Sequence, residues 1–257
     1  MTCIHVFTIH NVRHDIECQY GRIIVMTTFQ ERQLVLMRQM EQSFASNPHT
    51  ATIVPMQTDF INDPQMALTA VSYLPKDIAA IITRTVIEPL KTIEPEFYYY
   101  PAVSMHITVQ NVRVIHDPPR FTAADIEVAR SVFRQSVKNE QPFTFSVHGI
   151  LAMPTSVSII ALGTPEYDWF VKQLRKDLSN AGVPDDKSYF TDELVFANIT
   201  IARFTHTPST EFLKKLESLN HIDIGTVVIK DMHLVAMNAG ANREKTTVLE
   251  TYRFAEK

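Results

Sequence analysis

Two short stretches of the chain carry the residue types that phosphate chemistry uses. The first holds His106 and Thr108 two positions apart, and the second holds Asn198 and Thr200 at the same spacing. A histidine can move a proton, and a neighbouring hydroxyl can donate a hydrogen bond to a phosphoryl oxygen. Asparagine donates and accepts hydrogen bonds, but it cannot relay a proton near neutral pH. The first stretch therefore suits one proton transfer beside a phosphoryl oxygen, and the second offers hydrogen-bonding groups without a group that relays a proton.

Each stretch lies in a run of alternating apolar and polar residues, which is typical of a strand with one buried face. On a regular strand Gln110 would share the polar face with His106 and Thr108. By the same alternation, Arg203 would face away from Asn198, so a structural ion pair is the expected role of its guanidinium.

Three other groups have possible roles in a site. Residues 98–100 are three consecutive tyrosines, for which packing is expected, with stacking on a nucleobase as the alternative. His148 is expected on an exposed strand face, although a place in a cleft stays open. Arg175 is expected, with its neighbouring lysines, on a solvated helix face.

Composition excludes several function classes. The 257 residues include 24 basic and 28 acidic side chains, for a net charge of −4. This balance disfavours proteins that neutralise many phosphates by bulk charge, but it permits one focused basic pocket. The chain has 6 glycines and lacks the glycine-rich phosphate loops and the nucleophile elbow. The common triphosphate, dinucleotide and serine-hydrolase classes therefore lose their support.

Neither a metal nor a cofactor is expected. Cys3 and Cys18 have no Cys-x-x-Cys partner, and no His-Glu-x-x-His motif occurs. Polar residues interrupt the first 28 positions, which lack the apolar run of a signal peptide. No apolar stretch approaches the roughly 18 residues of a membrane helix. We therefore expect a cytoplasmic protein with no membrane partner.

The elements that would position these residues follow from apolar periodicity and from turn residues. Thr122 and Asp125 are expected to cap the helix that they begin. A further helix is expected to open at Thr164-Pro165 and to end before Gly182. A short strand is possible at 23–28. The remaining strands are expected at 67–74, 101–112, 143–153, 157–162, 194–204, 226–237 and 246–254, and the remaining helices at 29–46, 76–90, 122–137 and 209–219.

This order predicts an α+β chain whose sheets are covered by helices on one side. A soft boundary at Asn62-Asp63-Pro64-Gln65 divides the chain. Residues 1–64 are expected to form an extension packed on the main domain. Residues 65–257 are expected to form two lobes, because a strand and helix followed by paired strands occurs twice.

The motifs resemble those of the 2H phosphoesterase superfamily, which includes the 2′-5′ RNA ligase-like proteins and cyclic phosphodiesterases. That family carries two His-x-Thr/Ser motifs on facing strands of a two-lobed fold. The second motif is often followed by Leu-Ala-Arg, and here residues 200–203 read Thr-Ile-Ala-Arg. The layout from 65 to 254 is also similar, including the closing strand at 248–254.

The resemblance implies a fold with two antiparallel-rich sheets facing across a cleft, with helices outside. It implies metal-independent opening of a 2′,3′-cyclic or 2′-5′-linked phosphodiester, and a nucleotide or RNA terminus as partner. His106 would be the acid or base, and Thr108 and Thr200 would hold the non-bridging oxygens. Asn198 replaces the second histidine and would only bind substrate, so turnover is expected to be weak or absent. The alternative is a degenerate module that binds a nucleotide or RNA end.

Overall fold

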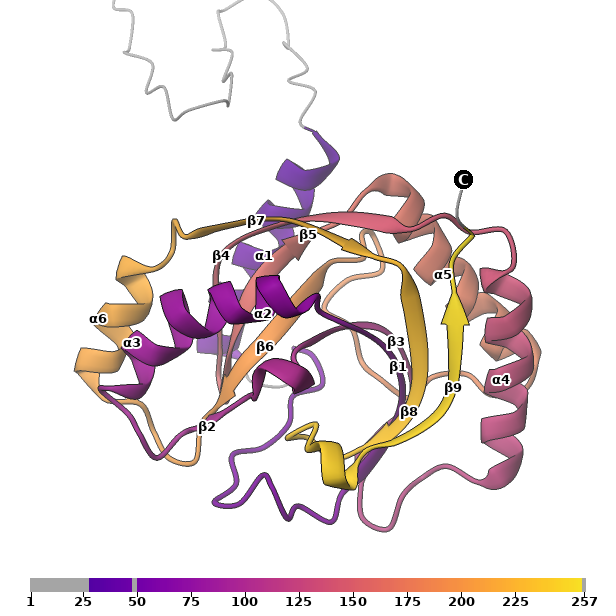
Figure 1. Cartoon of the computed structure of the whole chain (residues 1–257), viewed down its shortest axis with the longest axis horizontal. Helices are drawn as coiled ribbons and strands as arrows, with labels where there is room; N and C mark the ends of the chain where they lie inside the picture. Colours follow the sequence, from indigo (N-terminus) through magenta and orange to yellow (C-terminus); the bar gives the residue numbers. More distant parts are fainter. Residues whose placement is uncertain (1–27, 48–49, 256–257) are drawn as a thin grey trace, which may run out of the picture.

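The computed structural model describes residues 28–47 and 50–255, which form an α+β fold (Figure 1). Its helices are α1 (Phe29–Ser46), α2 (Lys76–Ile82), α3 (Glu88–Lys91), α4 (Ala123–Val137), α5 (Pro165–Asn180) and α6 (Thr210–Ser218). A π-helical turn (Thr83–Ile87) joins α2 to α3, and 3-10 turns lie at Ala102–Ser104 and Arg243–Lys245. Its strands are β1 (Met66–Tyr73), β2 (Tyr98–Tyr99), β3 (His106–His116), β4 (Phe143–Met153), β5 (Ser156–Leu162), β6 (Ala197–Arg203), β7 (Asp223–Ile229), β8 (Asp231–Met237) and β9 (Thr247–Arg253).

All the described strands belong to one antiparallel sheet. Eight follow the order β7-β4-β5-β6-β3-β1-β8-β9, and β2 pairs with β6. The sheet has two halves, because β3 and β6 are joined only at Ile107 and Ile199. The expected two-lobed α+β fold is therefore confirmed, with the two halves of one sheet meeting along the strands β3 and β6.

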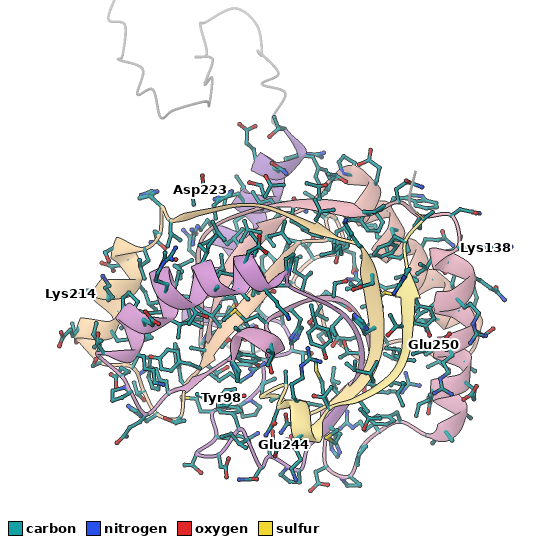
Figure 2. All side chains as sticks on the ribbon, in the orientation of Figure 1. Tyr98, Lys138, Lys214, Asp223, Glu244 and Glu250 are labelled. Atoms are coloured by element: carbon teal, nitrogen blue, oxygen red, sulfur yellow. The ribbon has the colours of Figure 1, made fainter. Side chains whose placement is uncertain are left out.

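Helices cover the two halves separately. The pair α4 and α5 packs together and contacts β9 and β3 of one half. The other half is contacted by α2 and α6, and α3 packs on α6. Figure 1 shows these two groups at opposite sides of the curved sheet. Figure 2 shows Glu250 on β9 beside α4, where Arg134 donates to its carboxylate at 2.8 Å.

The helix α1 packs on the opposite face of β4 and β5 from the main core. Met37, Met40 and Phe44 form a buried stripe along α1 at helical spacing. The stripe contacts Leu151 and Ile160, whereas the neighbouring Ile150 and Ile159 point into the main core. The helix α1 thus covers an apolar patch on this half of the sheet.

Most expected elements are present within a few residues of their predicted bounds. Thr122 and Asp125 make the predicted reciprocal cap, with Thr122 accepting from the Asp125 amide at 3.2 Å. The single strand expected at 226–237 is wrong, because the chain changes partners at Lys230. The segment before Lys230 pairs with β4, and the segment after it pairs with β1 and β9. The possible strand at 23–28 lies almost wholly outside the described residues.

Among the described helices, none combines the length and apolar character that a membrane-spanning helix requires.

Candidate functional site

The two motif strands are neighbours at the centre of the sheet. Ile107 of β3 pairs with Ile199 of β6 in antiparallel register. In this register His106 lies opposite Thr200, and Thr108 lies opposite Asn198. Since neighbours of a paired residue project to the other face, the four polar side chains emerge together. All four line one pocket, as their strand parity predicts.

A bulge follows the threonine in each motif strand. Val109 is an extra residue of β3, because its neighbours pair with Val71 and Ala70, which are adjacent in β1. Ile201 is likewise an extra residue of β6 relative to β5. A bulge reverses the alternation of side chains beyond it. The residue three positions after each threonine therefore faces the pocket.

These two bulges correct two predictions. Arg203 lines the pocket with Asn198 and Thr200, so its predicted placement on the other face was wrong. Gln110, which a regular strand would place beside His106, is buried outside the pocket, and Asn111 lines the pocket in its place.

The pocket has a volume of about 220 Å³ and lies between the two halves of the sheet. Its lining includes Arg203, Lys187 and His106, and it contains no Asp or Glu within the described residues. Its hydroxyl and amide side chains are those of Thr52, Thr69, Tyr100, Thr108, Asn111, Thr155, Ser156, Ser158, Asn198 and Thr200. A pocket of donors and cations without carboxylates suits an anion, despite the net charge of −4.

The ring of His106 has a fixed tautomer. Its Nδ1 lies 2.7 Å from the carbonyl of Ser104, to which it donates, so the lone pair is on Nε2. Tyr73 and Tyr100 approach the ring edge-on, with centroids at 6.2 and 6.4 Å. Burial, together with the charges of Arg203 and Arg243, lowers the pKa of His106 to about 4. His106 is therefore neutral at pH 7 and can accept a proton on Nε2.

Asn198 is held by a hydroxyl rather than by a charged group. Its Nδ2 donates to Oγ of Ser158 at 2.9 Å, and that hydroxyl donates to Oγ1 of Thr200 at 3.3 Å. Ser158 lies opposite Thr200 on β5. The three side chains form a connected row of hydrogen-bonding groups, none of which relays a proton near neutral pH.

Arg203 is fixed by neutral oxygens. Its Nε donates to the Tyr100 hydroxyl at 2.7 Å and to the Ala239 carbonyl at 2.9 Å. The Tyr100 hydroxyl also donates to Ala239. No carboxylate within ion-pair distance was found among the described residues, so the predicted ion pair was wrong. The charge of Arg203 remains available to a bound anion.

Comparison with solved structures identifies the fold. The protein TT0787 of Thermus thermophilus has a TM-score of 0.52 at 15% identity, covering 73% of this chain and 97% of that one. E. coli LigT in its apo form has a TM-score of 0.52 at 13% identity, covering 75% and 99%. A third structure, of a protein described as a phosphoesterase, has a TM-score of 0.51 at 13% identity, covering 76% and 100%.

The chain has the fold of these three solved structures. No protein-family model matches the sequence. No curated protein matches it either. The likeness is thus one of fold, and about a quarter of this chain lies outside the match.

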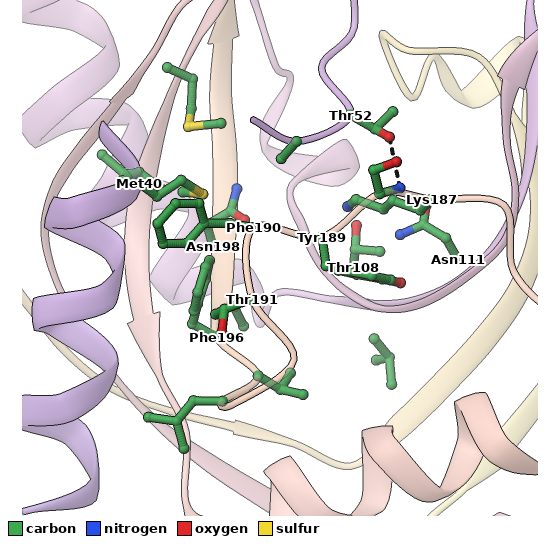
Figure 3. A pocket seen from close by; sticks show the side chains of 18 of the residues that line it. Met40, Thr52, Thr108, Asn111, Lys187, Tyr189, Phe190, Thr191, Phe196 and Asn198 are labelled. Carbon is green, nitrogen blue, oxygen red and sulfur yellow. Dashed lines mark hydrogen bonds between the residues drawn. The ribbon is translucent and has the colours of Figure 1, made fainter. Parts of the chain in front are cut away.

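A second, more apolar pocket of about 130 Å³ adjoins the first (Figure 3). The two pockets share residues that include Thr108, Asn198 and Lys187. The apolar lining of the second pocket is formed by Met40, Ala51, Val109, Leu151, Met153, Phe190, Leu194, Val195, Phe196 and Ala197.

Residues before position 65 contribute to both pockets. Met40 of α1 lines the apolar pocket, and Thr52 lines both. Thr52 exchanges hydrogen bonds with Ser188, at 3.1 Å from its amide and 2.9 Å to its hydroxyl. Figure 3 shows the second of these bonds beside Lys187. Thr155 donates to the carbonyl of Val54 at 2.7 Å and fixes the other end of this segment.

The loop before β6 carries Lys187, which sequence reasoning missed. Lys187 lines both pockets, and within the described residues its ammonium makes no hydrogen bond. Burial, with repulsion from Arg175 and Arg203, lowers its pKa to about 8, and Asp185 opposes the shift. No motif marks this lysine, since it lies in an irregular loop that only the fold brings to the site.

The remaining sequence candidates lie elsewhere or have other roles. His148 lines neither pocket and lies at a bulge of β4, half-buried beside Asp223. Arg175 lies 3.6 Å above the ring of Tyr189 and donates to Gln110, so its predicted place on a solvated face was wrong. Tyr98 packs as expected, donating to the carbonyl of Gly240.

The described residues contain no cluster of three or more His, Cys, Asp or Glu side chains that could hold a metal ion. Cys3 and Cys18, discussed as possible metal ligands, lie outside the described residues.

Proposed function

We propose that this protein is a 2H phosphoesterase-like protein that binds the phosphodiester of a nucleotide or RNA terminus. The observation that carries the proposal is the direct pairing of the two motif strands, which groups His106, Thr108, Asn198 and Thr200 in one pocket. The hydroxyls of Thr108 and Thr200 would hold the non-bridging oxygens, and Arg203 would balance their charge.

The nucleotide part of the proposal rests on the two adjoining pockets. The polar pocket offers donors and cations to a phosphate, and the apolar pocket offers aromatic and aliphatic side chains to a nucleobase. Phe190 and Phe196 line the apolar pocket and are the aromatic side chains that would stack on the base. Because the two pockets share Thr108, Asn198 and Lys187, one ligand can occupy both.

The first candidate activity is opening of a 2′,3′-cyclic or 2′-5′-linked phosphodiester without metal. For the cyclic substrate, Nε2 of His106 takes a proton from water as the new oxygen–phosphorus bond forms. The bond from phosphorus to the 2′ or 3′ oxygen breaks, and that oxygen takes up a proton. The neutral state of His106 at pH 7 supports its role as the base.

The second candidate is a binding module without turnover. The observation that favours it is Asn198, which replaces the second motif histidine and donates to Ser158. Losing one acid–base group costs about 10²–10⁴ in rate. The phosphate ligands remain in place in this alternative.

Two measurements test these candidates. A nucleoside 2′,3′-cyclic phosphate should raise the unfolding temperature of the wild type by binding only the folded state. The double variant Thr108→Ala and Thr200→Ala should lose this shift. Hydrolysis of the same compound should be abolished in His106→Ala and kept in His148→Ala, the control outside both pockets. Binding without hydrolysis would support the second candidate, and absence of both would contradict the proposal.

A further inference from the structure

A reaction that breaks a phosphodiester needs a proton donor for the leaving oxygen, and the motif strands supply no donor besides His106. A neutral His106 serves as the base, so a second group is needed. Asn198 cannot give up a proton near neutral pH. His148, the histidine that the sequence offers as a substitute, lines neither pocket. The donor must therefore come from another part of the described lining.

Among the described residues of the two pockets, the groups that can carry a proton are few. The hydroxyl protons of Tyr100 and Tyr189 are already donated, to the Ala239 carbonyl and to Asp185. The arginines hold their protons too tightly to act as acids. The remaining group is the ammonium of Lys187, which lies with Thr108 and Asn198 in both pockets.

We propose that Lys187 donates the proton to the leaving oxygen, in the place of the histidine that Asn198 replaces. The inference rests on the proposed phosphodiesterase activity. In the step, water forms the new bond to phosphorus and His106 takes its proton. The bond from phosphorus to the leaving oxygen breaks, and Lys187 protonates that oxygen. The proton then on His106 returns to Lys187 through solvent, so the protein is unchanged after the cycle.

The loop that carries Lys187 is fixed on both sides of it. Asp185 accepts from the Lys187 amide at 2.8 Å, and its other oxygen accepts from Gln110 at 2.6 Å. Asp186 accepts from the amide of Val114 at 2.6 Å. Ser188 is bonded to Thr52 through two hydrogen bonds. The backbone of Lys187 is thus anchored to β3 and to the extension, which limits the positions open to its ammonium.

The charges around Lys187 support a proton that can leave near neutral pH. The groups facing it are Arg175 of α5, Arg203 of β6, and Asp185 and Tyr189 of its own loop. Burial and the two guanidinium groups disfavour the ammonium, and Asp185 opposes them. The resulting pKa of about 8 keeps most molecules protonated at pH 7 and makes the proton easier to release than from an ordinary lysine.

The test measures hydrolysis of a nucleoside 2′,3′-cyclic phosphate by the full chain from pH 4 to 10. Wild type is expected to be active between about pH 4 and about pH 8, where His106 is neutral and Lys187 is charged. Lys187→Arg keeps the positive charge but holds its proton too tightly to act as an acid. It should bind the cyclic nucleotide, as measured by thermal shift, and lose about 10²-fold or more in rate.

Two further variants separate proton donation from a structural role. Lys176→Arg, on the exposed face of α5, should match wild type. Lys187→Met combined with Asn198→His should regain turnover, with the basic limb of the pH profile moved toward about 6.5, the value of an imidazole. A merely structural lysine would not give such a shift.

Full activity in Lys187→Arg, or a basic limb that the lysine variants leave unchanged, would overturn the assignment. If the wild type binds the cyclic nucleotide but shows no turnover that depends on His106, the assignment fails while the binding module stands. If it neither binds nor hydrolyses the compound, the proposed function itself fails.

Discussion

The amide of Asn198 lies opposite Thr108 and donates to the hydroxyl of Ser158 at 2.9 Å. A histidine at this position could make the same contact through Nδ1 and present Nε2 to the pocket. It would then occupy the position on β6 that His106 occupies on β3. Asn198 is therefore the position at which a second imidazole would enter this pocket.

Asn198→His is expected to raise the hydrolysis of a 2′,3′-cyclic nucleotide, because it adds a group that gives and takes protons near neutral pH. The gain should be about 10²-fold in the Lys187→Met background, where no other donor competes, and smaller in wild type. Steady-state kinetics with matched binding measurements would check this. Adding His106→Ala should remove the gain, since the two groups act as a unit.

A folded Asn198→His protein that binds the cyclic nucleotide but gains no activity in either background would contradict the prediction. It would mean that the imidazole cannot reach the leaving oxygen from this backbone position.

At the scale of elements, the sequence predicted most of the helices and strands. Alternation in β3 and β6 also predicted that His106, Thr108, Asn198 and Thr200 share a pocket. Those predictions succeed because period-two alternation and helix caps are local signals, readable within a few residues.

The predictions that failed all depend on contacts between residues that are far apart in the sequence. A bulge depends on the partner strand, so the extra residues Val109 and Ile201 leave no local signal, and Arg203 was placed on the wrong face. The change of partners at Lys230 was missed for the same reason. Lys187 was missed because a loop residue reaches the site only through tertiary contacts.

The helix α1 gives a prediction about stability. Met37 is fully buried in the cluster between α1 and the strands β4 and β5. Met37→Ala should lower the free energy of unfolding by about 2–5 kcal/mol, the usual cost of a large-to-small change in a packed cluster. Urea unfolding would measure it. Val35→Ala on the exposed face of the same helix is the matched control and should change stability by less than about 0.5 kcal/mol.

Equal stability of the two variants would contradict this account, since it would mean that α1 contributes little to the fold. A loss in Met37→Ala would support the proposal that residues 1–64 form an extension packed on a main domain of residues 65–257. In that arrangement the extension both covers β4 and β5 and supplies Met40 and Thr52 to the pockets.

At the scale of the whole molecule, the distribution of charge matters more for binding an anion than the net charge does. The chain carries −4 overall, yet the described lining of the two pockets holds Arg175, Lys187, Arg203 and no carboxylate. Asp185, whose charge acts on Lys187, lies outside both linings and accepts hydrogen bonds from Gln110 and Tyr189. The fold thus concentrates positive charge between its two halves, where an anion would be attracted and held.

The burial of His106, together with the charges of Arg203 and Arg243, makes the stability of the protein depend on pH through the pKa of this histidine. His106 has a folded-state pKa of about 4, well below the value of about 6.5 for an unfolded chain. Between these two values the unfolded chain binds a proton that the folded protein does not. The contribution of His106 to stability is therefore fully present above about pH 6.5 and is lost as the pH falls toward about 4.

Replacing this histidine should remove that dependence. His106→Gln keeps a polar side chain of similar reach without a titrating group. We expect the free energy of unfolding of wild type to fall more steeply than that of His106→Gln between pH 6.5 and pH 4.5. Urea unfolding of both proteins at several pH values would give the difference curve, in which the other titrating groups cancel. Parallel curves would contradict the prediction, and would mean that water reaches the ring of His106 and that its proton affinity is that of an unfolded chain. A difference that grows toward low pH would show that the folded protein keeps His106 neutral, as the proposed role of this residue as the base requires.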